Sequence, residues 1–370
     1  MKVGVIGFGY WGPKLARNLL ELPGAMLEWV VDLDPARLAR VKAQYPSLHV
    51  THCLEDLLLS DVDAVVVATP IRTHYQLARK ALLAGKHVMV EKPLAASSGE
   101  AEELVALADR LGLTLMVGHT FEYNPAVHAL RDIVASGELG QVYYVDTARL
   151  NLGLFQPDIN VLWDLAPHDL SILLYVLQRE PLAISARGSA HVTPGIHDVA
   201  YVELRFPDNV IANVHVSWLD PCKVRRVTIV GSKKMVVYND VQESEKIRIY
   251  DKGVERPFEA DRLGEYRLTY RYGSIVVPYI PLSEPLRAQC EHFLDCIRTG
   301  TRPRSDGRVG ARVVRILEQA ERSLVEDGAR LPITSNSTGA RSGPPLRERP
   351  AAYHVQTHGP NGRSALAAWD

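Results

Sequence analysis

Residues 1–20 read MKVGVIGFGYWGPKLARNLL, in which an apolar run is followed at once by closely spaced glycines. Val3–Ile6 predicts a strand, and the segment after the glycines predicts a helix. Gly7, Gly9 and Gly12 form the pattern GxGxxG between these two elements. In that position the first glycine permits a tight turn, the second lets the backbone approach a pyrophosphate, and the third allows close packing of helix on strand. The stretch therefore predicts a dinucleotide-binding turn, with the phosphates at the N-terminus of the helix.

Asp32 stands twenty residues after Gly12, at the end of the next predicted strand. A carboxylate there accepts hydrogen bonds from the ribose hydroxyls of the adenosine half and repels a 2′-phosphate. The nearest cation that follows Asp32 is Arg37. We therefore expect NAD as the cofactor, and NADP stays the alternative because Arg37 could turn toward a 2′-phosphate.

Residues 1–120 alternate between apolar strands and amphipathic helices. Strands that are apolar on both faces and are joined by helices are typical of a parallel sheet covered on both sides. We therefore expect a doubly wound Rossmann domain of the α/β class. The expected strands and helices are Val3–Ile6, Pro13–Glu21, Met26–Asp32, Pro35–Gln44, Ala64–Ala68, Thr73–Ala84, His87–Glu91, Ser98–Leu111 and Thr114–Gly118.

Residues 121–330 differ, because strands with alternating apolar and polar residues dominate there. Such alternation indicates a sheet with one covered face. We expect a second, α+β domain that binds substrate, built on a large, open, mostly antiparallel sheet, with helices in residues 285–326 returning to the first domain. Residues 335–370 are rich in Ser, Gly, Pro and Arg, which predicts a flexible tail. The expected segments are Pro125–Ser136, Gln141–Leu150, Pro167–Leu177, Ala183–Val192, Val199–Phe206, Val210–Trp218, Val224–Val230, Met235–Tyr238, Lys246–Tyr250, Pro285–Thr299 and Arg308–Glu326.

The composition excludes several classes of protein. The 370 residues carry 42 Lys and Arg against 43 Asp and Glu, a net charge of -1 that argues against a general nucleic-acid binder. No apolar run reaches the roughly 18–20 residues that span a bilayer, and the chain begins without a signal-peptide pattern. The four cysteines have no CxxC spacing, which favours free thiols over a metal site or disulfides. We expect a cytoplasmic protein with neither a nucleic-acid nor a membrane partner.

Lys92 ends the predicted strand within GKHVMVEKP, residues 85–93. The carboxyl edge of such a sheet is where ligands bind. An ammonium group there polarises a substrate oxygen and lowers the pKa of a reacting hydroxyl. The alternative is a solvated surface lysine, which the following Pro93 makes less typical.

Asp164 and His168 lie four residues apart in DLAPH, a spacing that places both on one face of a helix. Pro167 disfavours a helix that runs through the pair. A histidine oriented by a carboxylate suits general acid/base catalysis of alcohol–ketone interconversion. We expect its ionisation near the histidine reference of roughly 6.5, or lower because of Lys92. The spacing alone leaves open that His168 caps a helix and Asp164 is merely exposed.

The glycine motif with Asp32, the stretch THYQLARKALLAGKHVMVEKP over residues 73–93 and DLAPH over 164–168 together resemble the Gfo/Idh/MocA family of oxidoreductases. The resemblance runs from residue 1 to about residue 330. It implies NAD(P)-dependent oxidation or reduction of sugars, cyclitols or nucleotide sugars, and a C-terminal sheet that often forms the oligomer interface. The segment Asp158–Trp163 departs from the commoner glycine-rich approach and resembles a subgroup of nucleotide-sugar and antibiotic-sugar dehydrogenases or ketoreductases.

Residue by residue, the resemblance makes Lys92 the lysine that contacts substrate and nicotinamide ribose, His168 the proton donor or acceptor, and Asp164 its acidic partner. The expected cofactor-binding residues are Gly7, Phe8, Gly9, Tyr10, Trp11, Gly12, Asp32, Ala68, Thr69, Pro70, His74, Glu91 and Lys92. The expected substrate-binding residues are Tyr123, Asn124, Arg149, Asn151 and Asn160. For Arg149 and Asn151, a solvated strand end is the open alternative.

Lys223, Arg225 and Arg226 form a basic stretch after Trp218. They could meet a phosphate of a nucleotide sugar. We favour a charged strand edge that prevents aggregation.

Together these features predict an NAD(P)-dependent oxidoreductase that acts on a secondary hydroxyl or ketone of a sugar-like ring. Lys92 would supply the charge that zinc supplies in other alcohol dehydrogenases, so we expect no metal. Apolar residues on the uncovered face of the second sheet predict a homodimer or homotetramer. The alternatives are a reductase of a non-sugar substrate on the same fold and a non-catalytic NAD-binding regulatory protein.

Overall fold

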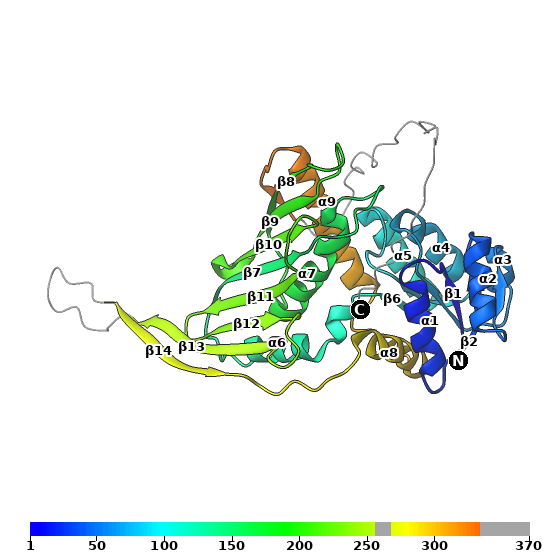
Figure 1. Ribbon diagram of the computed structural model, residues 1–370, viewed down its shortest axis with the longest axis horizontal. Coiled ribbons are helices and arrows are strands. Elements are labelled where there is room, and N and C mark those ends of the chain that lie inside the picture. Colours follow the sequence, from blue (N-terminus) through cyan, green and yellow to red (C-terminus); the bar gives the residue numbers. More distant parts are fainter. Residues whose placement is uncertain (256–267, 334–370) are drawn as a thin grey trace, which may run out of the picture. The chain divides into compact units, whose positions relative to one another are not determined.

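The first sheet of the structure, a computed structural model that describes residues 1–255 and 268–333, has six strands (Figure 1). Its order is β3-β2-β1-β4-β5-β6, and all neighbours are parallel. The predicted doubly wound sheet is therefore confirmed. The strands are β1 Lys2–Ile6, β2 Met26–Val31, β3 His49–Thr51, β4 Ala64–Val67, β5 His87–Val90 and β6 Leu115–Val117. The helices between them are α1 Gly12–Glu21, α2 Pro35–Gln44, α3 Leu54–Leu58, α4 Ile71–Leu83 and α5 Ser98–Leu111.

Helices cover both faces of this sheet, which explains its continuous apolar strands. In β4, Ala64 and Val66 belong to one buried cluster, while Val65 and Val67 belong to another. β3 and α3 were not expected, because three and five residues are too few to show a periodic pattern. The order of strands reverses between β1 and β4, and the crevice at such a point is where this fold binds ligands.

The second sheet has nine strands in the order β14-β13-β12-β11-β7-β10-β9-β8-β15. Within the described residues its neighbours are antiparallel except for β7 and β10, so the prediction of a mostly antiparallel sheet is confirmed. The strands are β7 Val142–Leu150, β8 Ala183–Ser189, β9 Val199–Arg205, β10 Ile211–Ser217, β11 Val224–Gly231, β12 Met235–Asn239, β13 Ile247–Glu255, β14 Thr269–Val276 and β15 Leu331–Pro332.

One face of the second sheet packs against α6 Pro125–Ala135 and α7 Val161–Leu177 (Figure 1). Alternation along β10 places Val214 and Val216 under these helices, whereas Asn213 and His215 lie on the other face.

α7 begins earlier than predicted, at Val161 instead of near Pro167. Asn160 caps it by accepting a hydrogen bond from the Trp163 amide at 3.2 Å. A proline inside a helix costs about 3 kcal/mol, but this helix is buried along most of its length, and that packing offsets the cost. Pro167 was expected to disfavour a helix through the pair, but α7 continues through it, and Asp164 and His168 share one helix.

Two helices from the end of the described chain return to the first sheet. α8, Pro285–Thr299, packs on α1, and α9, Gly307–Val325, lies between α5 on one side and α7 and β8 on the other. Asp306 caps α9 by accepting from the Val309 amide at 3.0 Å. No helix in the described ranges is long and apolar enough to cross a membrane. The tail predicted over residues 335–370 lies outside the described residues.

Candidate active site

A cavity of about 1420 Å³ lies where the carboxyl ends of β1, β4 and β5 meet α7 and the ends of β7, β10 and β11. It gathers most of the residues that the sequence singled out, from both domains. The predicted residues that line it are Gly7, Gly9, Tyr10, Trp11, Asp32, Ala68, Thr69, Pro70, His74, Glu91, Lys92, Asn124, Arg149, Asn151, Asp164 and His168.

The glycine turn has a shape that other residues would not adopt. Gly7 has φ +93°, and a Cβ there would lie 2.6 Å from the Ala68 carbonyl oxygen. A Cβ on Gly12 would run into the Gly7 carbonyl, so α1 packs directly on the turn. A Cβ on Gly9 would meet only Arg37 at 3.7 Å, which leaves the backbone there open to the cavity.

Among the described residues no side chain caps the first turn of α1, and the Lys14 and Leu15 amides donate to the Trp11 carbonyl oxygen, each at 3.0 Å. The positive end of the helix therefore faces the glycine turn without a side-chain cap. This open backbone, the uncapped helix end and the carboxylate of Asp32 fit the pyrophosphate and adenosine ribose of a dinucleotide.

Asp32 is buried and held by two backbone amides. Its Oδ2 accepts from the Phe8 amide at 2.6 Å, and its Oδ1 accepts from the Asp34 amide at 2.8 Å. Arg37 Nη1 lies 3.4 Å from Oδ2. Phe8 therefore contributes to the site through its backbone amide, which holds Asp32. The Asp32 carboxylate partly neutralises Arg37, and a 2′-phosphate would have to approach that same carboxylate.

His74 holds together two loops that line the cavity. Its ring nitrogens lie 2.7 Å from the Thr69 carbonyl oxygen and 2.8 Å from the Pro93 carbonyl oxygen. The ring is buried, and burial lowers the pKa of His74. The residue thus fixes the loops after β4 and β5 relative to each other.

Lys92 bridges the two domains. Its Nζ donates to the Asp164 carbonyl oxygen at 2.7 Å and lies 3.3 Å from Asp164 Oδ1. Trp218 Nε1 donates to Asp164 Oδ2 at 3.0 Å, so both carboxylate oxygens are fixed. The sequence reasoning missed Trp218, because a tryptophan at the end of a strand carries no signal of a polar role. The solvated-lysine alternative is wrong, since the Lys92 side chain is 10% exposed.

His168 lines the same cavity, one turn of α7 beyond Asp164, with its ring edge against Phe121. Burial, and then the charges of Lys92 and Arg149, hold the pKa of His168 well below its usual value. Nδ1 is buried and has no hydrogen-bond partner among the described residues. His168 is therefore a neutral imidazole at neutral pH, the form that accepts a proton.

His119 is a further buried histidine that the sequence reasoning missed. Neither ring nitrogen has a hydrogen-bond partner in the described part of the chain. Burial, and then the charge of Lys92, lower the pKa of His119 to about 3. At neutral pH the His119 ring is therefore neutral, as is that of His168, and it adds no positive charge to that of the Lys92 ammonium.

Glu91, next to Lys92, is also buried, and burial raises its pKa to about 7.

The raised pKa of Glu91 makes the stability of the protein depend on pH. Its contribution to the free energy of unfolding is fully present below the pKa of the unfolded chain, near 4.5. That contribution is lost as the pH rises to about 7. The free energy of unfolding should therefore fall by up to about 1.4 kcal/mol per pH unit across this window. In Glu91→Gln the fall should be smaller, since Glu122, whose pKa burial also raises, keeps its own contribution. Urea unfolding of both proteins at several pH values measures this, and equal slopes would contradict it.

Two predicted substrate residues do not line the cavity. Tyr123 is buried, with its hydroxyl 2.9 Å from Ser305 Oγ. Asn160 caps α7 and donates from Nδ2 to Glu321 at 2.7 Å. Both side chains serve the fold, and the sequence could not show this because their partners lie more than 150 residues away.

The other predicted substrate residues remain at the cavity. Arg149 is buried in a pair with Asp169, at 2.6 Å from Nε to Oδ2, so the solvated-strand alternative is wrong for it. Asn124 donates to the Tyr238 hydroxyl at 3.2 Å, while Asn151 is half-buried in the cavity wall.

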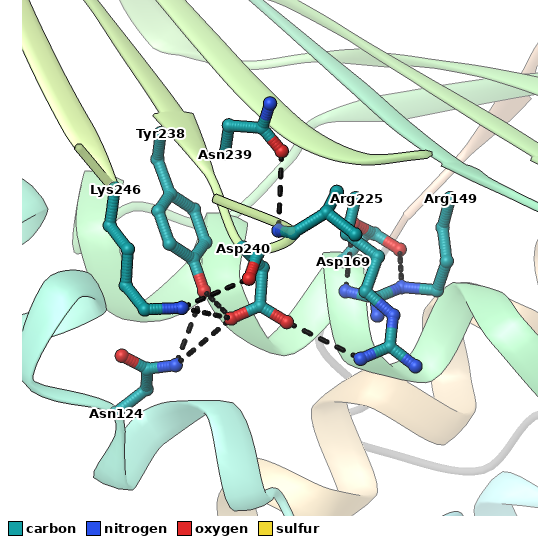
Figure 2. Close-up of polar contacts among 9 residues, drawn as sticks. Asn124, Arg149, Asp169, Arg225, Tyr238, Asn239, Asp240 and Lys246 are labelled. Atoms are coloured by element: carbon teal, nitrogen blue, oxygen red, sulfur yellow. Dashed lines mark hydrogen bonds and ion pairs between the residues drawn. The ribbon is translucent and has the colours of Figure 1, made fainter. Parts of the chain in front are cut away.

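A polar network between β11, β12 and α6 was not predicted (Figure 2). Asp240 is its centre: Tyr238 donates to Oδ1 at 2.8 Å, and Arg225 Nη1 lies 3.3 Å from Oδ2. Lys246 Nζ donates to the Asp240 carbonyl at 2.9 Å. β11 lies inside the sheet, so the interpretation of Arg225 as an edge charge is wrong, whereas Arg226 is exposed.

Comparison with known proteins agrees with this arrangement. Residues 1–119 match the oxidoreductase family with an NAD-binding Rossmann fold, and residues 127–237 match the GFO/IDH/MocA C-terminal domain. The structure of GenD2 from gentamicin A biosynthesis in complex with NAD superposes with a TM-score of 0.76 at 25% identity, covering 90% of this chain and 97% of that one.

The curated relatives that match by sequence include two named dehydrogenases of a cyclitol and of a nucleotide sugar. The inositol 2-dehydrogenase 2 of Saccharopolyspora erythraea is 30% identical over 225 residues, 58% of this chain and 66% of that protein. The UDP-N-acetylglucosamine 3-dehydrogenase of Acidithiobacillus ferrooxidans is 30% identical over 332 residues, 85% of this chain and 94% of that protein. Since this similarity spans both domains, the chain belongs to the Gfo/Idh/MocA family of NAD-binding oxidoreductases.

Proposed function

We propose that this oxidoreductase interconverts a secondary alcohol and a ketone on a sugar, nucleotide sugar, aminosugar or cyclitol. The observation that carries the proposal is the Lys92–Asp164 pair, which joins the edge of the nucleotide-binding sheet to the helix that bears His168. When bound, NAD would accept the hydride of the carbinol carbon. The named activities of the two curated relatives, on a nucleotide sugar and a cyclitol, support this substrate class.

In the oxidative direction, neutral His168 accepts the proton of the substrate hydroxyl, directly or through a water molecule. The Lys92 ammonium stabilises the negative charge that develops on the same oxygen. Asp164 holds Lys92 in place, and Trp218 holds Asp164. In the reductive direction the same groups return the proton to the alkoxide.

A panel of sugars, cyclitols, aminosugars and nucleotide sugars, followed by NADH absorbance with NAD and with NADP, tests the proposal. Turnover of one class is the expected result. Turnover confined to non-sugar alcohols would favour a reductase of another substrate on this fold. Cofactor binding without turnover of any alcohol would favour a non-catalytic regulatory protein, although both Lys92 and His168 line the cavity.

Asp32→Ala should weaken NAD binding by about 10- to 100-fold, since hydrogen bonds to a charged carboxylate are lost. The change also frees the Phe8 amide and Arg37 to meet a 2′-phosphate, so the preference should shift toward NADP. Calorimetric titration with both cofactors measures the shift, and Asp61→Ala, an exposed carboxylate paired with Lys2, is the control. Equal use of both cofactors by the unmodified enzyme would mean that Asp32 does not meet the ribose.

We also propose a homodimer or homotetramer joined through the uncovered face of the second sheet. That face presents Tyr144 and Tyr201, which are 47% and 50% exposed. Soluble monomers rarely expose a large apolar patch. Light scattering at micromolar concentration should give a dimeric or tetrameric mass, and Tyr201→Arg should lower it. A monomeric mass for the unmodified chain would contradict this proposal.

A further inference from the structure

Three cations line the end of the cavity that the second sheet forms: Lys223, Arg225 and Lys246. Arg225 lies in β11, while Lys223 and Lys246 directly precede β11 and β13. The Arg225 and Lys246 side chains are 40% and 22% exposed and Lys223 is exposed as well, so all three charged groups are accessible to a molecule in the cavity that they line.

An arginine at position 225 reduces the stability of the sheet, which is unexpected for a residue with a purely structural role. In the antiparallel register it stands directly opposite Arg149, on the face of the sheet that also carries the buried Val227. Like charges directly opposite each other destabilise a sheet. Each arginine needs its own carboxylate there, Asp169 for Arg149 and Asp240 for Arg225. Apolar residues would fill the same space without these charges.

Asp240 holds two of the cations in defined places (Figure 2). Its Oδ2 lies 3.3 Å from Arg225 Nη1, and its carbonyl oxygen accepts from Lys246 Nζ at 2.9 Å. Tyr238 and Asn124 donate to Oδ1 at 2.8 and 3.4 Å, which fixes the carboxylate itself. Arg225 and Lys246 thus stand on either side of one anchored carboxylate.

The charge at this end is not balanced. Within the described ranges Lys223 forms no ion pair, and the carboxylates that line the cavity near the three cations are Asp240 and Glu243. This end also lies near the reacting centre. Arg225 stands opposite Arg149, whose guanidinium lies 4.4 Å from the centre of the Phe121 ring, and that ring contacts His168.

We propose that Arg225, Lys246 and Lys223 bind an oxyanion, a phosphate or carboxylate group, that the sugar-like substrate carries. The inference rests on the proposed function and narrows its substrate class. A guanidinium fork beside two ammonium groups matches the geometry and charge of such an oxyanion. Neutral sugars and cyclitols would leave the positive charge that exceeds Asp240 and Glu243 at this end of the cavity uncompensated.

Matched substrate pairs test the inference: glucose against glucuronate for a carboxylate, and N-acetylglucosamine against UDP-N-acetylglucosamine for a phosphate. In one pair the anionic member should have the higher kcat/KM, and Arg225→Gln should reduce that advantage about 10- to 100-fold, mainly through KM. Lys223→Gln should do the same more weakly. Because Lys223 has no ion pair in the described part of the chain, this variant keeps the test valid if Arg225→Gln fails to fold.

Arg226→Gln is the matched control, because it removes the same charge from the opposite face of the same strand. It should leave the anionic-to-neutral ratio unchanged. Neutral members that react as well as the anionic ones, or a ratio that all variants leave unchanged, would overturn the inference while the proposed oxidoreductase stands.

If no member of either pair reacts, the proposed function fails for these substrates, and binding decides the inference separately. Calorimetry with NADH present would then use glucuronate and inorganic pyrophosphate as probes. Binding that Arg225→Gln and Lys223→Gln weaken, and Arg226→Gln does not, supports the oxyanion site. Equal or absent binding in all four proteins overturns it.

Discussion

Lys92→Met should lower turnover by about 10²–10³-fold, the range for removing one group that stabilises a developing oxyanion. Methionine keeps most of the side-chain volume, so the change removes charge rather than packing. NAD affinity should change little, because the glycine turn and Asp32 do not contact this ammonium. Asp164 also loses its cation, but Trp218 still holds Oδ2. Turnover by NADH absorbance and NAD affinity by calorimetry separate the two effects.

The control for this variant is Lys234→Met, which removes a half-buried lysine paired with Glu138 outside the cavity. It should keep full turnover. If Lys92→Met loses NAD binding and turnover in equal measure, Lys92 is a cofactor ligand and not a charge for the reacting oxygen. Near-full turnover in Lys92→Met would place the stabilising charge elsewhere.

His168→Ala should lower turnover by about 10²–10⁴-fold, the usual contribution of a positioned acid or base. NAD should again bind, because His168 lies on α7 of the second domain. Small bases such as imidazole, added to the variant, should restore part of the turnover by entering the space that the ring leaves.

The pH profile distinguishes His168 from its neighbours. The expectation was an ionisation near 6.5, or lower because of Lys92. Burial, and then the charge of Lys92, hold the pKa of His168 well below its usual value. In the oxidative direction the acid limb assigned to His168 should therefore lie on the acidic side of 6.5, and His168→Ala should abolish it. An ionisation near 7 would belong to Glu91 and should vanish in Glu91→Gln. If His168→Ala keeps near-full turnover and the same profile, Asp164 is the next residue to test.

Much of the cofactor half of the site could be predicted because its determinants are local. Gly7 to Gly12, Asp32 and the strand that ends at Lys92 lie in short segments whose backbone shape follows from glycine geometry and strand patterning. Doubly wound topology then places every strand end at one edge. For this half, the local sequence was enough to predict which residues line the cavity.

The substrate half depended on contacts between distant segments. The sequence by itself indicated a parallel and a mostly antiparallel sheet, though not the strands β3, β14 and β15, together with the cofactor turn and the Asp164–His168 spacing. Only the tertiary structure decided that Asn160 and Tyr123 serve the fold, that Trp218 orients Asp164, and that Arg225 faces the cavity instead of an edge. The physical reason is that a side chain's role here depends on its neighbours across strands and helices. The register of β11 and β12 brings Asp240, which pairs with Arg225, to the cavity. No local sequence pattern indicates that pairing.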